Sequence, residues 1–300
     1  MDTNKYLQQV LASQDLPDDS QELKDLQNRR KDVEELLRSY FAKSSPTVRY
    51  GGSHAKGTLI RDYYDLDLAC YFPHDDTAAG PTLKDVYNNT AKALEPHYYL
   101  DKKTSAIRLK SRDPKTYATD FHIDVVPGRY TGPEKGDTFL YQSAGDKERL
   151  KTNLDVHIQH VKDSGVVEAI RLLKLWKVRR GLRVKQFVFE LLIIDLLAKK
   201  KGAQLSDQLE YLWTQFRDRS EAPAVQDPAN PTGNDLTAIL KAEWSSLSLT
   251  AASTLAAIQS SGWESVFGKV EDKTSAEKVA ALRSAAAAVA APTKPWHADE

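Results

Sequence analysis

The sequence predicts a mixed α/β N-terminal lobe followed by an all-helical C-terminal lobe, with the boundary near residue 150. Short runs in which apolar and polar residues alternate lie between Thr47 and about Tyr130, as expected of half-buried strands. From Val166 onward, apolar residues recur three or four positions apart, as expected of helices that pack on a core. A chain of 300 residues is long enough to form one large domain or two modest ones.

Positive and negative side chains are equal in number. The 42 Lys and Arg residues balance 42 Asp and Glu residues, which gives a formal net charge of +0. Hydrophobic residues make up 41% of the chain, far from the low-hydrophobicity, high-charge composition of disordered proteins. Proteins that grip a nucleic-acid backbone over a broad surface carry a visible basic excess. We therefore expect a folded protein without a stable nucleic-acid complex, in which any anion-binding site is local.

Cysteine content and hydropathy indicate the compartment. A single cysteine, Cys70, excludes an internal disulfide and a cysteine-rich zinc site, which suits a reducing cytosol. The N-terminal residues lack the basic region and apolar core of a secretion signal. The longest apolar stretch, Phe187–Ala198, is interrupted by Glu190 and Asp195 and is too short to span a bilayer. The expectation is a cytoplasmic protein without a membrane partner.

The N-terminal lobe, residues 1–150, is expected to begin with a long helix. Residues 20–42 carry apolar side chains mostly three, four or seven apart, and Asp19 with Glu22 forms a capping-box pattern at the start. A shorter helix is expected at residues 82–96. The strands expected in this lobe are Asp65–Phe72, Ser105–Leu109 and Thr119–Val126.

The C-terminal lobe, residues 151–291, is expected to be helical and follows a turn-rich, charged stretch around Thr131–Glu148. Residues 227–234 hold two prolines and a glycine, which predicts a shaped loop. Alanine-rich helical sequence continues to about Ala291, and residues 292–300 are expected to form a flexible tail. The helices expected before the loop are Val166–Val178, Phe187–Leu197 and Leu205–Phe216.

Two carboxylates are expected on one face of the strand at residues 65–72. Alternation places Asp65 and Asp67 opposite an apolar face made by Leu66, Leu68, Cys70 and Phe72. The two acids then lie about 7 Å apart along the backbone and repel each other unless a cation lies between them. A divalent ion bound through oxygen ligands would explain the pair. The ordinary alternative is an exposed edge strand with a charged outer face.

A glycine-rich turn upstream favours the metal-ion explanation. Gly52 and Ser53 follow another glycine and precede Lys56, Gly57 and Thr58. Glycine lets the backbone approach a phosphate, whose oxygens can bind the serine hydroxyl, backbone N–H groups and the positive end of a helix that starts there. Such a turn before a strand with two carboxylates is typical of a metal-nucleotide site.

A third carboxylate is required to hold two magnesium ions and to position an attacking hydroxyl. The strand around residues 119–126 offers three polar side chains on one face, Asp120, His122 and Asp124. We choose Asp124 because apolar residues flank it directly, and we expect Pro127 to end the strand soon afterwards. Asp120 is expected at the solvated start of the strand. His122 is either a proton acceptor or a partly exposed strand histidine, and the second reading is the ordinary one.

The stretch Gly52–Leu68 resembles the signature of the polymerase-β-type nucleotidyltransferases. It is most similar to the oligoadenylate synthase branch, which includes the bacterial cGAS/DncV-like nucleotidyltransferases that make cyclic oligonucleotide signals. Leu173–Trp176 is similar to the helical Lys-x-Trp element of the family, and Asp227–Asn234 to a loop of the oligoadenylate synthases. The resemblance covers about residues 20–270. It implies a polymerase-β-like lobe and a helical lobe with the active site in the cleft between them.

The resemblance also implies roles for individual residues. Asp65 and Asp67 would bind two Mg²⁺ ions, which Mn²⁺ can replace, and Asp124 would bind the ion that activates the acceptor hydroxyl. Phe187 would stack on a nucleobase, although from the residues alone it is as well explained as part of the core. Lys56 would contact the acceptor nucleotide, with an exposed loop lysine as the alternative. The residues assigned to nucleotide binding are Gly52, Ser53, Lys56, Lys174, Gln186 and Phe187.

A basic segment, residues 171–185, contains seven cations and no acid. Such a run is most often a solvated surface. The alternative is that it faces the carboxylates across the cleft. The resemblance then assigns Lys174 to the triphosphate of the nucleotide.

The sequence therefore predicts a nucleotidyltransferase that condenses nucleoside triphosphates, with ATP expected among them, into a cyclic di- or trinucleotide and releases pyrophosphate. By resemblance alone, it would act in bacterial anti-phage (CBASS) signalling, with regulatory or effector proteins of a defence operon as partners. One alternative is a template-independent RNA 3′-end nucleotidyltransferase of the CCA-adding or poly(A) type. The others are a protein-nucleotidylating toxin and an inactive nucleotide-binding sensor.

Overall fold

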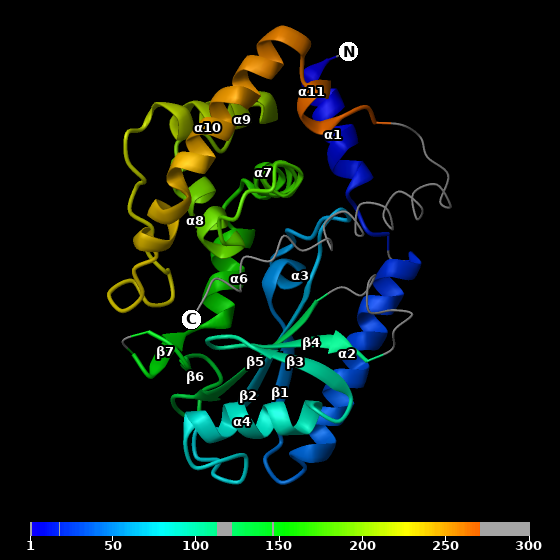
Figure 1. Ribbon diagram of the computed structural model, residues 1–300, viewed down its shortest axis with the longest axis vertical. Helices are drawn as coiled ribbons and strands as arrows, with labels where there is room; N and C mark the ends of the chain where they lie inside the picture. Colours follow the sequence, from blue (N-terminus) through cyan, green and yellow to red (C-terminus); the bar gives the residue numbers. More distant parts are fainter. Residues whose placement is uncertain (1, 18, 113–121, 146, 271–300) are drawn as a thin grey trace, which may run out of the picture.

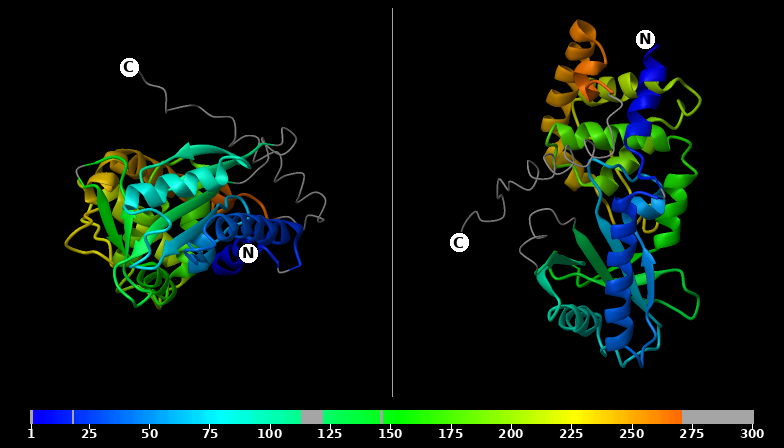
Figure 2. Two further views of the ribbon diagram at one scale, coloured as in Figure 1. Left: turned by 90° about the horizontal axis from the view of Figure 1, so that it is seen from below. Right: turned by 90° about the vertical axis from the view of Figure 1, so that its right-hand side faces the viewer.

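A mixed β-sheet forms one end of the molecule and a group of helices forms the other (Figure 1; Figure 2, right). The computed structural model describes residues 2–17, 19–112, 122–145 and 147–270. The sheet lies in the first half of the chain, and the chain is helical from residue 154 to residue 267 apart from its connecting loops. The predicted fold class, a mixed α/β lobe with a helical C-terminal region, is confirmed.

The described residues form one sheet of seven strands in the order β1-β2-β5-β4-β3, to which β6 is added beside β5 and β7 beside β6. Of these pairs, β2 and β5 run parallel, and the others are antiparallel. The parallel register places Asp67 of β2 beside Asp124 of β5. The strands are β1 (Thr47–Tyr50), β2 (Leu66–Phe72), β3 (Tyr98–Lys102), β4 (Ile107–Ser111), β5 (Ile123–Tyr130), β6 (Thr138–Tyr141) and β7 (Arg149–Thr152).

The two faces of β2 differ as the alternation predicts. Leu66, Leu68, Cys70 and Phe72 are buried in a core that includes residues of α2 (Gln21–Tyr40) and α4 (Leu83–Leu94). Ala69 and Tyr71 point to the opposite face, where they cluster with Tyr130 and Leu140. Asp67 lies on that second face, because strand residues alternate. The carboxylate is thus kept away from the core that α2 and α4 cover.

Two predicted boundaries are wrong. The N-cap of α2 is Ser20 rather than Asp19, because the Ser20 hydroxyl accepts the N–H of Leu23 at 3.2 Å. Pro127 does not end β5, which continues to Tyr130. The antiparallel neighbour of β5 changes there from β4, which pairs as far as Val125, to β6, which pairs from residue 128. The missing N–H of Pro127 therefore interrupts neither antiparallel ladder.

Other elements differ from the expectation because they are too short to give a clear alternation of apolar and polar residues. The stretch around residues 131–148, expected to be turns, contains β6 and leads into β7, each only four residues long. The strand expected at residues 105–109 lies two residues further on, at β4. Asp120, the start of the strand expected at residues 119–126, and the expected helix after residue 270 lie outside the described residues.

The helical core includes a helix that is not among the expected elements, α1 (Thr3–Ser13). Tyr6, Leu7, Val10 and Leu11 of α1 are buried with the C-terminal helices, so the two ends of the described chain share one core. None of the helices in the described residues combines the length and apolarity needed to cross a membrane. The helices that follow the sheet are α6 (Leu154–Lys162), α7 (Val167–Arg179), α8 (Gln186–Leu196), α9 (Leu205–Asp218), α10 (Thr237–Ser261) and α11 (Glu264–Phe267).

Candidate active site

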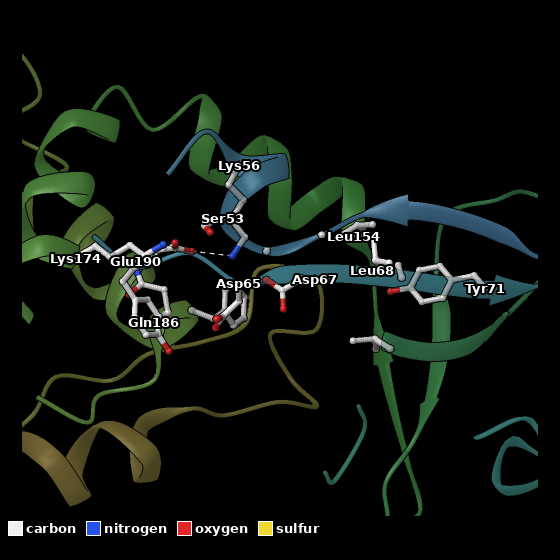
Figure 3. Close-up of a pocket in the computed structure, with 16 residues that line it drawn as sticks. Ser53, Lys56, Asp65, Asp67, Leu68, Tyr71, Leu154, Lys174, Gln186 and Glu190 are labelled. Carbon is white, nitrogen blue, oxygen red and sulfur yellow. Dashed lines mark hydrogen bonds and ion pairs between the residues drawn. The ribbon is translucent and has the colours of Figure 1, made fainter. Parts of the chain in front are cut away.

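A cavity of about 320 Å³ lies between the sheet and the helices. Its walls come from the five-residue helix α3 (Gly52–Lys56), from β2 and the residues before it, from β5, and from α6, α7 and α8. Figure 3 shows the carboxylates Asp65 and Asp67 across from Lys174, Gln186 and Glu190. The predicted site residues that line the cavity are Gly52, Ser53, Lys56, Asp65, Asp67, Lys174, Gln186 and Phe187. Asp124, the remaining one, is not among the lining residues.

Gly52 connects the turn to the carboxylates. Its φ of +52° favours glycine, and a Cβ atom there would lie 1.6 Å from Oδ2 of Asp67. The N–H of Gly51 donates to the backbone oxygen of Asp67 at 2.8 Å. The sequence predicts that this glycine admits a phosphate, and the structure shows that it also admits the Asp67 side chain. The turn and the acidic strand are therefore built as one unit.

Asp67 lies in an environment that opposes its ionisation. Burial, followed by the nearby charges of Asp65 and Asp124, raises the pKa of Asp67 to about 7. Lys56 and Lys174 favour the charged form but do not outweigh these effects. Nδ1 of His122, which is 41% exposed, lies 3.6 Å from Oδ1 of Asp65. A divalent cation beside Asp65 and Asp67 would offset the repulsion between the carboxylates, so these two oxygen donors fit a hard metal ion.

Asp124 has a partner that the sequence did not indicate. Arg108, directly across from it on β4, donates two hydrogen bonds to its carboxylate, from Nε at 2.8 Å and from Nη2 at 2.7 Å. In the described residues, no three side chains of His, Cys, Asp or Glu are close enough together to bind one metal ion. Asp65 and Asp67 line the cavity, where a cation could reach both, whereas the carboxylate of Asp124 is already bound by Arg108.

The opposite wall holds two buried lysines and a buried glutamate. Nζ of Lys56 donates to Oε2 of Glu190 at 2.7 Å (Figure 3), and Glu190 is fully buried on α8. The other oxygen of Glu190 accepts from the Thr58 hydroxyl at 3.0 Å and from Nε2 of Gln186 at 3.3 Å. Lys174 lies beside this network, and its Nζ donates to the backbone oxygen of Thr58 at 3.4 Å. Burial lowers the pKa of Lys174 to about 8.

The structure bears on two alternatives that the sequence left open. Lys56 is buried, so its interpretation as an exposed loop lysine is wrong. The basic segment does not face the carboxylates as a whole, because a helix presents only one side to the cavity, and Lys174 is its lining residue. Arg171 bonds instead to Asp15 at 2.6 Å, and Arg179 bonds to Asp62 at 2.7 Å.

Phe187 and Gln186 begin α8 at the edge of the cavity. Phe187 is half-buried and packs against the helical core, and it also lines the cavity, so it belongs partly to the core while its ring is accessible from the cavity. The ammonium group of Lys56 lies 4.7 Å from the centroid of its ring. Oε1 of Gln186 is buried and accepts no hydrogen bond from any described residue. A ligand that donates to this oxygen would satisfy it.

Sequence reasoning missed three contributors to this site: Glu190, Arg108 and Tyr63. In the sequence, Glu190 interrupts an apolar stretch, which counts against a membrane span but does not indicate a partner for its charge. Its position four residues after Gln186 on one helix was the available signal. Tyr63 lines the cavity, and the charge of Asp65, together with burial, raises the pKa of its hydroxyl. For Arg108, the strand register had to be known.

Comparison with known proteins shows which sequences and structures the chain resembles. No protein-family model matches the sequence. The chain is 25% identical to the cyclic AMP-AMP-AMP synthase of Escherichia coli (strain MS 115-1), in a match that covers 61% of this chain and 66% of that relative, just under two thirds of its length.

Solved structures show the same fold. CdnC of E. coli MS115-1, solved with ATP and in a complex with HORMA-deltaN, superposes with a TM-score of 0.64 at 20% identity. The superposition with the ATP form covers 90% of this chain and 99% of CdnC. The CD-NTase CdnG of Bradyrhizobium diazoefficiens, in complex with GTP, gives a TM-score of 0.67 at 14% identity and covers 94% of this chain and 98% of CdnG. The chain thus resembles the cGAS/DncV-like nucleotidyltransferases in sequence and shares their fold, which confirms the resemblance expected from its residues.

Proposed function

We propose that the protein is a nucleotidyltransferase that condenses nucleoside triphosphates into a cyclic oligonucleotide and releases pyrophosphate. One observation carries this proposal: a single cavity presents two carboxylates, Asp65 and Asp67, on one wall and two buried lysines, Lys56 and Lys174, on the other. A metal-bound triphosphate is complementary to both walls, because its cation suits the carboxylates and its phosphate oxygens suit the ammonium groups.

The reaction would be the attack of a ribose hydroxyl on the α-phosphorus of a nucleoside triphosphate. A new oxygen–phosphorus bond forms as the hydroxyl releases its proton to solvent, the bond to the bridging oxygen breaks, and pyrophosphate leaves with both electrons of that bond. Mg²⁺, or Mn²⁺ in its place, would be held by Asp65 and Asp67 with Asp124 as a third ligand, and would supply charge neutralisation and a lowered pKa of the hydroxyl. Transfer of this kind depends mainly on positioning and charge neutralisation.

Different residues would carry out different parts of this reaction. Ser53 and Lys174 would hold the triphosphate in line with the acceptor, with the backbone of Gly52 close to it. Lys56 would contact the acceptor nucleotide, and its bond to Glu190 keeps its ammonium group at the cavity. Phe187 would provide a surface for a nucleobase, and Gln186 would accept a hydrogen bond from the base or the sugar.

The relatives support a more specific product and partner. A cyclic trinucleotide built from ATP is supported by the name of the E. coli synthase, and a cyclic dinucleotide remains the other candidate. A regulatory protein partner is supported by the complex of CdnC with HORMA-deltaN. A role in bacterial anti-phage signalling and a cytoplasmic location rest on resemblance and composition alone.

Product analysis tests this function. The protein is incubated with the four nucleoside triphosphates, labelled at the α-phosphate, and Mg²⁺ or Mn²⁺. We expect a labelled product that resists phosphatase, because a ring has no terminal phosphate, and mass spectrometry with nuclease digestion identifies its bases and linkages. Replacing both Asp65 and Asp67 by Ala is expected to abolish it. An unchanged product from that variant would remove the two acids from the mechanism.

Three further assays separate this function from its rivals. Extension of tRNA or of an RNA 3′ end would favour an RNA nucleotidyltransferase, and label transferred to protein would favour a protein-nucleotidylating enzyme. Calorimetry that shows binding of a metal-bound triphosphate without any turnover would favour an inactive sensor.

A further inference from the structure

The loop between α9 and α10, Asp227–Asn234, has no part in the chemistry proposed above, yet it holds a buried carboxylate. Asp227 is 1% exposed. Its Oδ1 lies 2.7 Å from Nε2 of His157 and accepts the N–H of Ala229 at 2.9 Å, while its Oδ2 accepts from Nδ2 of Asn234 at 2.8 Å. Burial alone would raise the pKa of Asp227, but the bonds from His157 and Asn234 hold it below its ordinary value. The carboxylate is therefore ionised and fixed.

The loop around this carboxylate is held in one shape. A Cβ atom on Gly233 would lie 2.3 Å from Oδ1 of Asn230, so a larger residue there would displace the Asn230 side chain. Nδ2 of Asn230 donates to the backbone oxygen of Lys151 in β7 at 3.1 Å, and Nζ of Lys147 donates to that of Gly233 at 2.7 Å. Figure 1 shows the loop, in yellow, reaching from the helices to β7. The loop thus contacts both the sheet end and the helical end of the molecule.

His157 lies between the loop and the cavity. It lies on α6, and the centroid of its ring is 4.5 Å from that of Phe187, with the planes tilted by 47°. Because an ionised carboxylate only accepts hydrogen bonds, its partner nitrogen Nε2 carries the proton, which fixes the orientation of the imidazole. Phe187 therefore has a rigid neighbour, whose orientation is set by Asp227.

We propose that Asp227 and His157 are positioning residues that hold the ring of Phe187 at the edge of the cavity as the surface for a nucleobase. The inference rests on the proposed function, because it takes a nucleotide as the ligand. It also gives the loop Asp227–Asn234 a purpose, since the loop anchors His157, which supports the base-binding end of the cavity. Neither residue touches the reacting atoms.

The position of the ring can be read without any nucleotide. The chain is labelled with fluorophenylalanine, and Phe187→Leu identifies its signal among the eight phenylalanines. We expect Asp227→Asn and His157→Ala each to shift or broaden the Phe187 signal. The matched control is Asp235→Asn, because Asp235 is exposed near the same loop and its Oδ1 bonds to the N–H of Thr237. Thermal unfolding verifies that every variant is folded. An unmoved Phe187 signal in both folded variants would overturn the inference.

A double-mutant cycle shows whether the effect passes through Phe187. Equilibrium binding of a non-hydrolysable ATP analogue is expected to weaken about tenfold in His157→Ala and in Phe187→Leu, since base–aromatic stacking accounts for a difference of that size. The double variant should bind no more weakly than Phe187→Leu, and in turnover KM should rise more than kcat falls. Additive losses would overturn the inference. A separate outcome is that the unaltered protein forms no cyclic product while Asp227→Asn and His157→Ala still move the Phe187 signal. In that case the proposed function fails and the positioning role stands.

Discussion

The two walls of the cavity differ in how their charges are balanced. The lysine wall, formed by Lys56, Lys174 and Glu190, contains its own counter-charge, because Glu190 accepts from Lys56 and from two neutral donors. The carboxylate wall, formed by Asp65 and Asp67, lies next to a third acid, and the pKa of Asp67 rises to about 7 as a result of burial and of these charges. The lysine wall is thus assembled before a ligand arrives, whereas the carboxylate wall depends on an added cation.

The largest effect is expected from removing the counter-charge of the lysine wall. Glu190→Gln keeps the shape of the side chain but leaves the buried Lys56 without its anion. Breaking a buried ion pair in this way lowers the free energy of unfolding by about 3 to 5 kcal/mol. Chemical denaturation without ligand measures the loss, and a triphosphate should restore more stability to this variant than to the unaltered protein, because it replaces the missing negative charge.

Asp195→Asn is the matched control for that experiment. Asp195 is the other acid of α8 and is exposed in its last turn, where a negative charge is unfavourable, so removal of that charge should leave stability unchanged or slightly higher. If Glu190→Gln and Asp195→Asn behave alike, the lysine wall does not depend on its internal ion pair.

The next effect tests how the carboxylate wall is fixed in place. Gly52→Ala puts a methyl group where Oδ2 of Asp67 now lies, at a φ of +52°. We expect a loss of about 100-fold in kcat, since a displacement of about 1 Å in a catalytic group has that consequence. The control is Gly57→Ala, which has a φ of +74° but no atom within 4 Å of the added Cβ. Equal losses in both variants would show that backbone strain, rather than displacement of Asp67, causes the effect.

A smaller effect is expected at Lys174, whose buried ammonium group donates to the backbone oxygen of Thr58 rather than to a carboxylate. Lys174→Met should weaken triphosphate binding by about 10- to 100-fold, the range expected for the loss of a charged hydrogen bond. Lys185→Met, in the exposed part of the same basic segment, should bind as the unaltered protein does. Calorimetric titration with an ATP analogue distinguishes the two, and similar losses would show that the segment acts as a diffuse basic surface.

The smallest effect is a pH dependence of binding. Burial lowers the pKa of Lys174 to about 8, so its positive charge is lost as the pH rises through that value. Because a bound triphosphate favours the charged form, loss of this charge should lower the affinity by at most about tenfold per pH unit above about pH 8. Lys174→Arg should remove this fall, since arginine keeps its charge. An unaltered pH profile in Lys174→Arg would assign the dependence to another group.

The sequence was a good guide wherever a feature depends on neighbouring residues. Alternation along β2 placed Asp67 on the face away from Leu66 and Cys70, and the glycine pair marked the turn beside it. Because these signals are local, they survive without knowledge of the rest of the chain.

Features that depend on packing between distant segments could not be predicted in this way. The pair of Arg108 with Asp124 follows from the register of β4 against β5, and the bond between Lys56 and Glu190 joins residues 134 positions apart. The buried Asp227 could be placed in a shaped loop, but its partner His157 lies 70 residues earlier. In each case the chemistry of the residue was visible and its partner was not.

The central claim is that the carboxylate wall carries out the transfer while the lysine wall holds the nucleotide, and one paired measurement tests it. Pyrophosphate release from ATP with Mg²⁺ and metal-free binding of an ATP analogue are measured on Asp65→Asn/Asp67→Asn. We expect release to fall by about 1,000-fold or more, because metal-ion catalysis supplies several kcal/mol, while analogue binding is retained. Undiminished pyrophosphate release would contradict the claim.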